Sequence, residues 1–143
     1  MAAQILIVHR RAAARRFMRL GVSLMGYTAE EAGSSADARA LLGQRAFRAL
    51  VVEADLGDAD AADVIAAARD RQPGIPVLLV SAGARPPRGA EDAFLAEPFD
   101  LESLHRELAR LLRNRPPQRT LPPRPATAPV LRPSDGVQRL ARG

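Results

Sequence analysis

Apolar residues form short runs that alternate with amphipathic stretches along the first 114 residues. A run of about four to eight apolar residues is typical of a buried strand, and apolar residues that recur every three or four positions predict a helix. Strands are predicted at 5–8, 27–32, 49–52, 77–80 and 94–95. Helices are predicted at 11–25, from Ser34 or Ser35 to Leu42, across 64–68 and onward from Asp100, where leucines line one face.

Short apolar strands separated by helices indicate a parallel sheet that helices cover on both faces. The predicted fold class is therefore α/β, a doubly wound five-stranded parallel sheet. In such folds the functional crevice lies at the carboxyl ends of the strands. The residues at those ends are expected to meet in space although they are far apart in sequence: His9, Arg10, Glu53, Ser81 and Glu97.

The composition changes after residue 114. Residues 115–143 hold six arginines against one acidic residue, and seven of the twelve prolines. We expect a folded domain over 1–114 and a Pro/Arg-rich disordered tail over 115–143. The tail is either a solvated segment, a PxxP-type ligand, or an electrostatic handle for nucleic acid or acidic protein. Nucleic acid is the less favoured partner, because the tail has no aromatic residue on which bases could stack.

Several function classes are excluded by composition. The chain has no cysteine, and all 21 of its basic residues are arginine, which excludes disulfides, thiolate sites and lysine chemistry. No pair of nucleophile and base at usable spacing emerges, so we expect no enzymatic activity. No apolar run approaches the roughly 18 residues of a membrane span, and we expect a cytoplasmic protein.

Five segments together resemble a known family. They are 5–8, Gly26-Tyr27, 47–63, 73–82 and 93–100. Their order and spacing are similar to those of the receiver (CheY-like) domain of bacterial two-component response regulators, over about residues 4–113. The resemblance implies a flavodoxin-like sheet of order 2-1-3-4-5 and a role in signal transduction.

The resemblance also implies a phosphorylation site that this chain does not reproduce. The family has an acidic pair after the first strand, a phospho-accepting Asp after the third, a Ser or Thr after the fourth and a Lys after the fifth. The chain has His9 and Arg10 at the pair, Glu53 at the acceptor, Ser81 at the hydroxyl position, Glu97 at the Lys, and Phe94 at the aromatic switch position. The chain is therefore interpreted as a degenerate pseudo-receiver.

These departures predict a site without a metal ion. Mg²⁺ prefers oxygen ligands, whereas His9 offers nitrogen and Arg10 offers only donors, so Mg²⁺ binding should be weak or absent and no cofactor is expected. We predict that the Arg10 guanidinium bridges Glu53 and Glu97 in place of the ion. The alternatives are that Arg10 points to solvent or that Arg11 turns inward. Glu53 is either a partial mimic of a phosphorylated residue or an inert filling of the pocket.

The segment between Ser81 and Glu97 predicts a shortened or missing fourth helix, because adjacent prolines at 86 and 87 cannot continue a helix. The family's switch from phosphate through Ser81 and Phe94 is then not expected to operate. Both residues are interpreted as structural, Ser81 through a bond to a strand-end amide and Phe94 as a core aromatic.

Four arginines follow the first strand end at near-helical spacing: Arg11, Arg15, Arg16 and Arg19. They are either a solvated face or a docking surface for an acidic partner, where receiver domains commonly meet kinase helices.

Three functions follow. The preferred one is a stand-alone atypical response regulator that acts as a phosphorylation-independent protein-interaction module. Its partner is expected to be a histidine kinase or another signalling protein, with nucleic acid and membrane not expected and a monomer or homodimer as the assembly. The second is a phosphorelay receiver that accepts phosphate at Glu53 or Asp55, and the third is an adaptor that binds nucleic acid or acidic protein through the tail.

Overall fold

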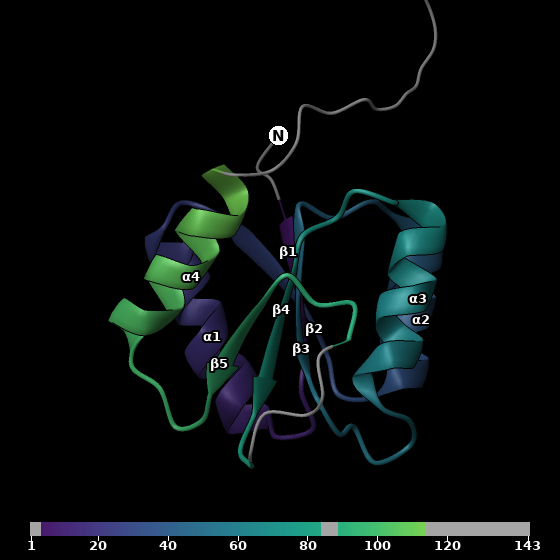
Figure 1. The fold of residues 1–143 in the computed structure, drawn as a ribbon, viewed down its shortest axis with the longest axis horizontal. Coiled ribbons are helices and arrows are strands. Elements are labelled where there is room, and N and C mark those ends of the chain that lie inside the picture. The colour runs from purple at the N-terminus through teal and green to yellow at the C-terminus, as the bar shows by residue number, and fades with distance from the viewer. Residues whose placement is uncertain (1–3, 84–88, 114–143) are drawn as a thin grey trace, which may run out of the picture.

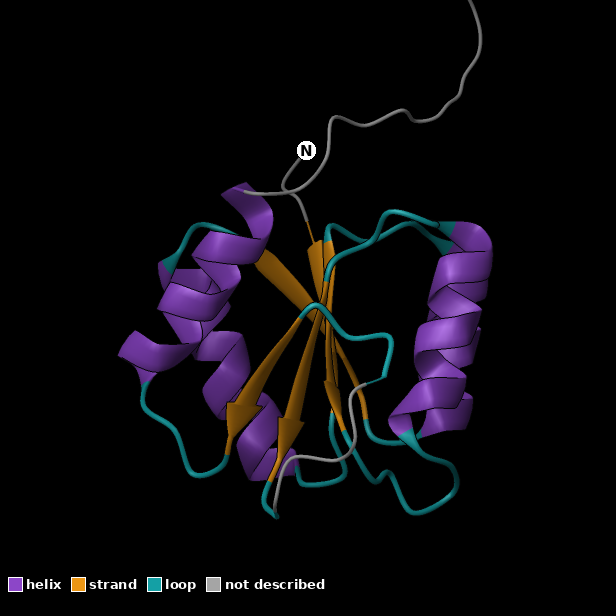
Figure 2. Cartoon of the chain, in the orientation of Figure 1, coloured by secondary structure: helices purple, strands orange, loops and turns teal. Residues whose placement is uncertain are grey.

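The computed structural model describes residues 4–83 and 89–113. They form a five-stranded parallel sheet with helices on both faces (Figures 1 and 2). The strand order is β2-β1-β3-β4-β5, as expected. The strands are β1 (Gln4–Val8), β2 (Thr28–Ala32), β3 (Ala49–Glu53), β4 (Val77–Ser81) and β5 (Ala93–Ala96). The predicted tail at 115–143 lies outside the described residues.

Four helices cover the sheet in the described part of the chain. They are α1 (Ala12–Leu24), α2 (Ser35–Gln44), α3 (Ala61–Arg71) and α4 (Leu101–Arg113). Helices α1 and α4 lie against one face of the sheet, and α2 and α3 lie against the other (Figure 1). Not one of these helices has the length and apolar character needed to cross a membrane.

The core consists of two layers because successive strand residues point to opposite faces. Leu6 and Val8 of β1 belong to the layer under α2 and α3, whereas Ile5 and Ile7 belong to the layer under α1 and α4. All four are completely buried. Burial on both sides explains why β1 is uniformly apolar rather than alternating.

The register places the carboxyl ends of the central strands at one level. Val8 pairs with Ala32 and Val52, and Glu53 pairs with Val80. The residues that follow the carboxyl ends of these strands therefore lie at the same edge of the sheet, the lower edge in Figure 1.

The link between β4 and β5 contains no helix in its described residues, 82–83 and 89–92, which agrees with the expected shortened or missing fourth helix. Residues 84–88, with the paired prolines, lie outside the described part. Side chains attach this link to α3 instead. Arg69 donates to the carbonyls of Ile75 and Ala90 and to the Asp92 carboxylate at 2.8 Å. Asp92 also accepts the backbone N–H of Val77 at 2.8 Å, which fixes the approach to β5.

The start of α2 is capped twice. The Ser34 hydroxyl accepts the backbone N–H of Asp37 at 3.1 Å. From the loop after β3, the Asp58 carboxylate accepts the N–H groups of Ser35 at 3.0 Å and Ala36 at 3.1 Å. The N–H of Ser35, with that of Ala36, holds the pKa of Asp58 below its ordinary value. Two loops that are distant in sequence are thus joined at the start of α2.

This cap predicts a pH-dependent contribution to stability. Because the pKa of Asp58 is lower in the folded state, its contribution is complete above the unfolded value of 3.8 and is lost as the pH falls through the folded value. The Asp58→Asn variant should therefore melt below wild type at neutral pH, and the gap should narrow as the solution is acidified. Asp70→Asn, an exposed carboxylate of α3, is the control. An Asp58→Asn gap that stays constant down to pH 2.5 would contradict this role.

Candidate functional site

Three ionisable side chains meet where β1, β3 and β5 end. They are His9, Glu53 and Glu97, which we call the strand-end triad. One ring nitrogen of His9 and one carboxylate oxygen of each glutamate all lie within 4.8 Å of one another. His9 is 1% exposed and Glu53 is 5% exposed, so the triad is largely shielded from solvent.

His9 connects the two glutamates. Its Nε2 lies 2.8 Å from Glu97 Oε2, and its Nδ1 lies 3.4 Å from Glu53 Oε1. The backbone N–H of Arg11 donates to Nδ1 at 3.1 Å. Because Nδ1 accepts this bond, the hydrogen bonds assign the ring hydrogen to Nε2, which donates it to Glu97. The imidazole therefore bridges the two glutamates in a defined orientation, by a hydrogen bond to Glu97 and a close contact with Glu53.

Arg10 contacts Glu53 but not Glu97. Its backbone N–H donates to Glu53 Oε1 at 2.8 Å, and its guanidinium lies 3.4 Å from Oε2. The side chain is 47% exposed, and the described residues contain no ion pair between Arg10 and Glu97. The prediction that Arg10 bridges the two glutamates is therefore wrong, since His9 forms that bridge.

The placement of the two side chains explains this correction. His9 and Arg10 directly follow β1, and their side chains approach Glu53 differently, one from the buried interior and the other from the half-exposed rim. His9 enters the site, and the stem of Arg10 passes over Gly57, where an added Cβ would lie 3.5 Å from Arg10 Cδ. Arg11 is exposed, so the alternative in which it turns inward is also wrong.

The remaining predicted positions have structural contacts. Ser81 accepts the N–H of Gly83 at 3.2 Å through its hydroxyl, and Phe94 packs against the core layer under α2 and α3, as interpreted from the sequence. Asp55 is exposed and accepts the N–H of Gly57 at 2.9 Å, so it belongs to the loop after β3.

The four arginines of the predicted docking face have different environments. Arg15 donates to the carbonyl of His9 at 2.7 Å and to Glu31 at 3.2 Å, so it holds the strand end in place. Arg19 is exposed but also pairs with Glu31, at 3.1 Å. Arg11 and Arg16 are exposed. The basic face is therefore partly neutralised by Glu31 and partly open.

Sequence reasoning missed an apolar surface on α1. The large apolar side chains that the described residues expose are Phe17 at 37%, Leu20 at 52% and Leu24 at 61%. With Ala13 they form what we call the α1 stripe. The spacing of these positions, four, three and four residues, is that of a helix-packing seam and was visible in the sequence.

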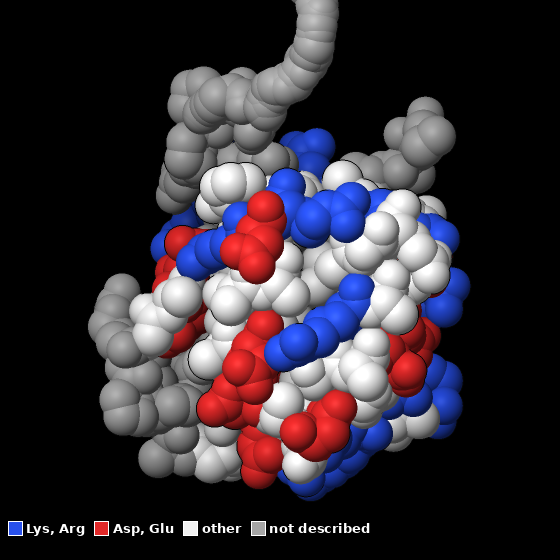
Figure 3. Space-filling view, turned by 90° about the vertical axis from the view of Figure 1, so that its right-hand side faces the viewer, with Lys and Arg blue, Asp and Glu red and all other residues white. Residues whose placement is uncertain are grey.

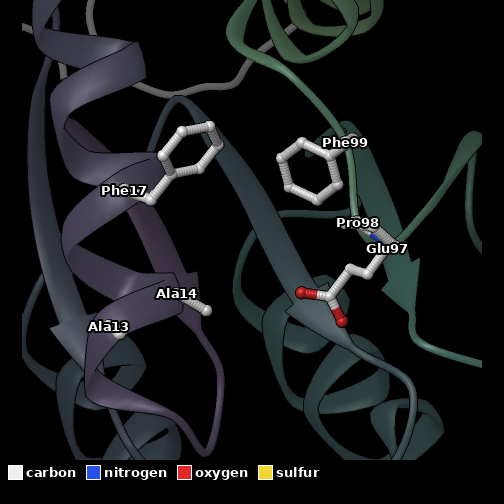
Figure 4. A pocket seen from close by; sticks show the side chains of 6 residues that line it. All are labelled: Ala13, Ala14, Phe17, Glu97, Pro98 and Phe99. Atoms are coloured by element: carbon white, nitrogen blue, oxygen red, sulfur yellow. The ribbon is translucent and has the colours of Figure 1, made fainter.

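A pocket of about 240 Å³ adjoins the stripe (Figure 4). Helix α1 contributes Ala13, Ala14 and Phe17, and the segment after β5 contributes Glu97, Pro98 and Phe99. The Phe17 and Phe99 rings are 6.0 Å apart at their centroids and tilted by 55°. Figure 4 shows the Glu97 carboxylate pointing from this segment toward α1. The pocket therefore shares Glu97 with the strand-end triad.

The opposite side of the molecule has a different character. Figure 3 shows the side that carries α2 and α3, where acidic and basic side chains are intermixed. The three exposed large apolar side chains all lie on α1 instead.

The strand-end triad does not fit the Mg²⁺ that the family resemblance implies. Mg²⁺ requires near-octahedral oxygen ligands. His9 presents nitrogen, Arg10 presents only donors, and Glu53 Oε1 already accepts the Arg10 N–H. No chemical step through Mg²⁺ follows from these residues.

The geometry predicts unequal effects for two neighbouring substitutions. His9→Ala leaves the buried Glu53 and the partly buried Glu97 without their bridge and should cost about 1–3 kcal/mol of unfolding free energy. Arg10→Ala keeps the backbone bond to Glu53 and removes only a half-exposed contact, so it should cost under about 1 kcal/mol. Urea unfolding of both variants measures the difference. A larger loss for Arg10→Ala would contradict the assignment of His9 as the bridge.

Comparison with known proteins supports the fold. No protein-family model and no curated protein sequence matches the chain. Among solved structures, a CheY-like receiver domain protein from Methanospirillum hungatei JF-1 has a TM-score of 0.74 and 19% identity, covering 80% of this chain and 97% of its own. CheY4 of Vibrio cholerae gives 0.72 and 20%, covering 78% and 100%. A sensor protein from Polaromonas sp. JS666 gives 0.72 and 26%, covering 80% and 98%. The chain therefore has the CheY-like receiver fold.

Proposed function

We propose that this chain is an atypical response-regulator receiver that binds a protein partner in two-component signalling without being phosphorylated. The observation that carries the proposal is the state of Glu53, the residue at the acceptor position. It is buried, and its two oxygens face the backbone N–H and the guanidinium of Arg10. A residue held in this way is a structural anchor rather than a free nucleophile.

The chemistry of phosphoryl transfer supports the same conclusion. An acceptor carboxylate needs an accessible oxygen and a cation that offsets the charge of the arriving phosphoryl group. Glu53 is 5% exposed, and the acidic pair that would hold the cation is replaced by His9 and Arg10. Asp55 is accessible but binds the Gly57 N–H in its own loop. Neither carboxylate therefore has the surroundings that an acceptor needs.

The α1 stripe is the surface on which we expect the partner to bind. Its spacing suits a helix packed along α1, and Arg16 and Arg19 flank it on one side. A second copy of this chain packed antiparallel along α1 would place these arginines on the same side of the seam, which is unfavourable. An amphipathic helix with acidic flanking residues is complementary both to the apolar stripe and to the arginines beside it. The proposed partner is such a helix in a histidine kinase or another signalling protein.

Incubation with a small phosphodonor and Mg²⁺ tests the first half of the proposal. We expect the intact mass of the full chain to remain unchanged, because Glu53 is engaged and the ligands that Mg²⁺ needs are missing. A receiver domain with the complete acidic site, treated in parallel, shows that the donor is active. A stable adduct of one phosphate would instead support the phosphorelay function at Glu53 or Asp55.

Binding to purified helical domains of histidine kinases from the same organism tests the second half. Leu20→Ser with Leu24→Ser should weaken binding at least about tenfold, since two exposed leucines lose their burial. Arg16→Glu should weaken it further and lower its salt dependence. Arg39→Ala, on the opposite side of the sheet, is the matched control.

Two outcomes would contradict the binding surface. One is unchanged affinity in the leucine variant with every kinase domain that binds wild type. The other is loss of binding when residues 115–143 are removed while the α1 stripe is intact, which would favour the adaptor function of the tail. Addition of the phosphodonor should leave the affinity unchanged.

A further inference from the structure

The strand-end triad has a donor set that suits a different kind of metal ion. It combines one imidazole nitrogen with two carboxylates, supplied by residues that directly follow β1, close β3 and follow β5. Mixed nitrogen and oxygen ligands suit borderline divalent ions such as Zn²⁺ and Co²⁺, whereas Mg²⁺ prefers oxygen alone. The histidine at position 9, which removes the fit to Mg²⁺, therefore gives the triad a donor set that fits these ions.

The distances are compatible with a single ion. Ligands bound to one Zn²⁺ at about 2.0–2.2 Å lie at most about 4.4 Å from each other. The triad's donor atoms all lie within 4.8 Å, and His9 Nε2 and Glu97 Oε2 are 2.8 Å apart. The bound of 4.8 Å is somewhat larger than that span, so the donor atoms have to move closer together to bind one ion.

The charge balance also favours a cation. The triad holds two carboxylates, Glu53 and Glu97, and the hydrogen bonds of His9 place a single ring hydrogen, on Nε2. The nearby Arg10 guanidinium supplies one positive charge, yet it is 47% exposed and 3.4 Å from Glu53. It can move outward while its backbone N–H keeps its bond to Glu53. A net negative charge then remains in a shielded site.

We propose that His9, Glu53 and Glu97 form a binding site for a borderline divalent transition metal ion, with Zn²⁺ as its best-fitting member. The ion takes the place of the hydrogen that His9 Nε2 shares with Glu97. That hydrogen moves to Nδ1, which lies 3.4 Å from Glu53 Oε1, and the Arg11 N–H gives up its bond to Nδ1. This exchange lowers the affinity relative to a preformed structural zinc site.

The site would keep a coordination position open. Three protein ligands leave room for a fourth, exchangeable ligand on Zn²⁺. Glu97 also lines the pocket between α1 and Phe99, so this position lies close to that pocket. The inference concerns the triad alone and does not depend on the proposed binding partner.

Titration of the tag-free full chain with Co²⁺ and Zn²⁺ tests the proposal. We expect one equivalent of Co²⁺ to produce visible absorption bands, which Zn²⁺ removes and a hundredfold excess of Mg²⁺ does not. The chain has two histidines, so imidazole NMR signals identify the ligand directly. Zn²⁺ should shift the signals of His9 and leave those of His105, whose Nε2 contacts the Gly21 carbonyl at 2.8 Å, unchanged.

Matched variants separate the triad from adventitious binding. Glu97→Gln keeps an oxygen that accepts the His9 hydrogen, so it should fold as wild type while its affinity for Zn²⁺ falls at least tenfold. His105→Asn should bind like wild type. The proposal is overturned if no Co²⁺ bands appear, if His9 signals do not respond, or if His105→Asn rather than Glu97→Gln abolishes binding. The Co²⁺ bands and the histidine NMR signals test the metal site whether or not the phosphodonor modifies the chain.

Discussion

The hydrogen-bonded imidazole of His9, held between Glu53 and Glu97, is the interaction on which the site depends. It joins the ends of three strands, and it lies between the buried carboxylate of Glu53 and the partly buried carboxylate of Glu97, of which the half-exposed Arg10 pairs only with the first. Through Glu97 it also holds the start of the segment that carries Phe99. A single ring therefore links the interior of the sheet to the surface beside α1.

At this edge of the sheet, contacts within the chain occupy the residue at the acceptor position. Glu53 is occupied by donors from its own chain, and the loop after β4 is attached to α3 through Arg69 rather than covered by a described helix. What stays accessible is the apolar stripe of α1 and the arginines beside it. The accessible surface of the molecule therefore lies away from the strand-end triad, and this is the physical argument for the proposed binding role without phosphorylation.

The features that could be predicted from the sequence are those with local causes. Apolar runs predicted β1, β3 and β4, and Gly26, with φ +91°, follows the end of α1 where the pattern predicted that the helix stops. Asp100 caps α4 by accepting the Ser103 N–H at 2.8 Å, as its position before the leucine pattern indicated. The choice between His9 and Arg10 depended on side-chain direction at the strand end, which charge balance alone does not determine. The α1 stripe has the same helical spacing as the buried Met18 and Val22, so the pattern alone does not show which apolar positions of α1 stay exposed.

The tautomer of His9 tests the bridge most directly. Nitrogen NMR of the full chain at neutral pH distinguishes a ring nitrogen that carries hydrogen from one that accepts a hydrogen bond. The account predicts hydrogen on Nε2, protected from exchange by Glu97, and a bare Nδ1 beside the Arg11 amide. A ring hydrogen on Nδ1, or one that exchanges as freely as in a solvent-exposed imidazole, would contradict it.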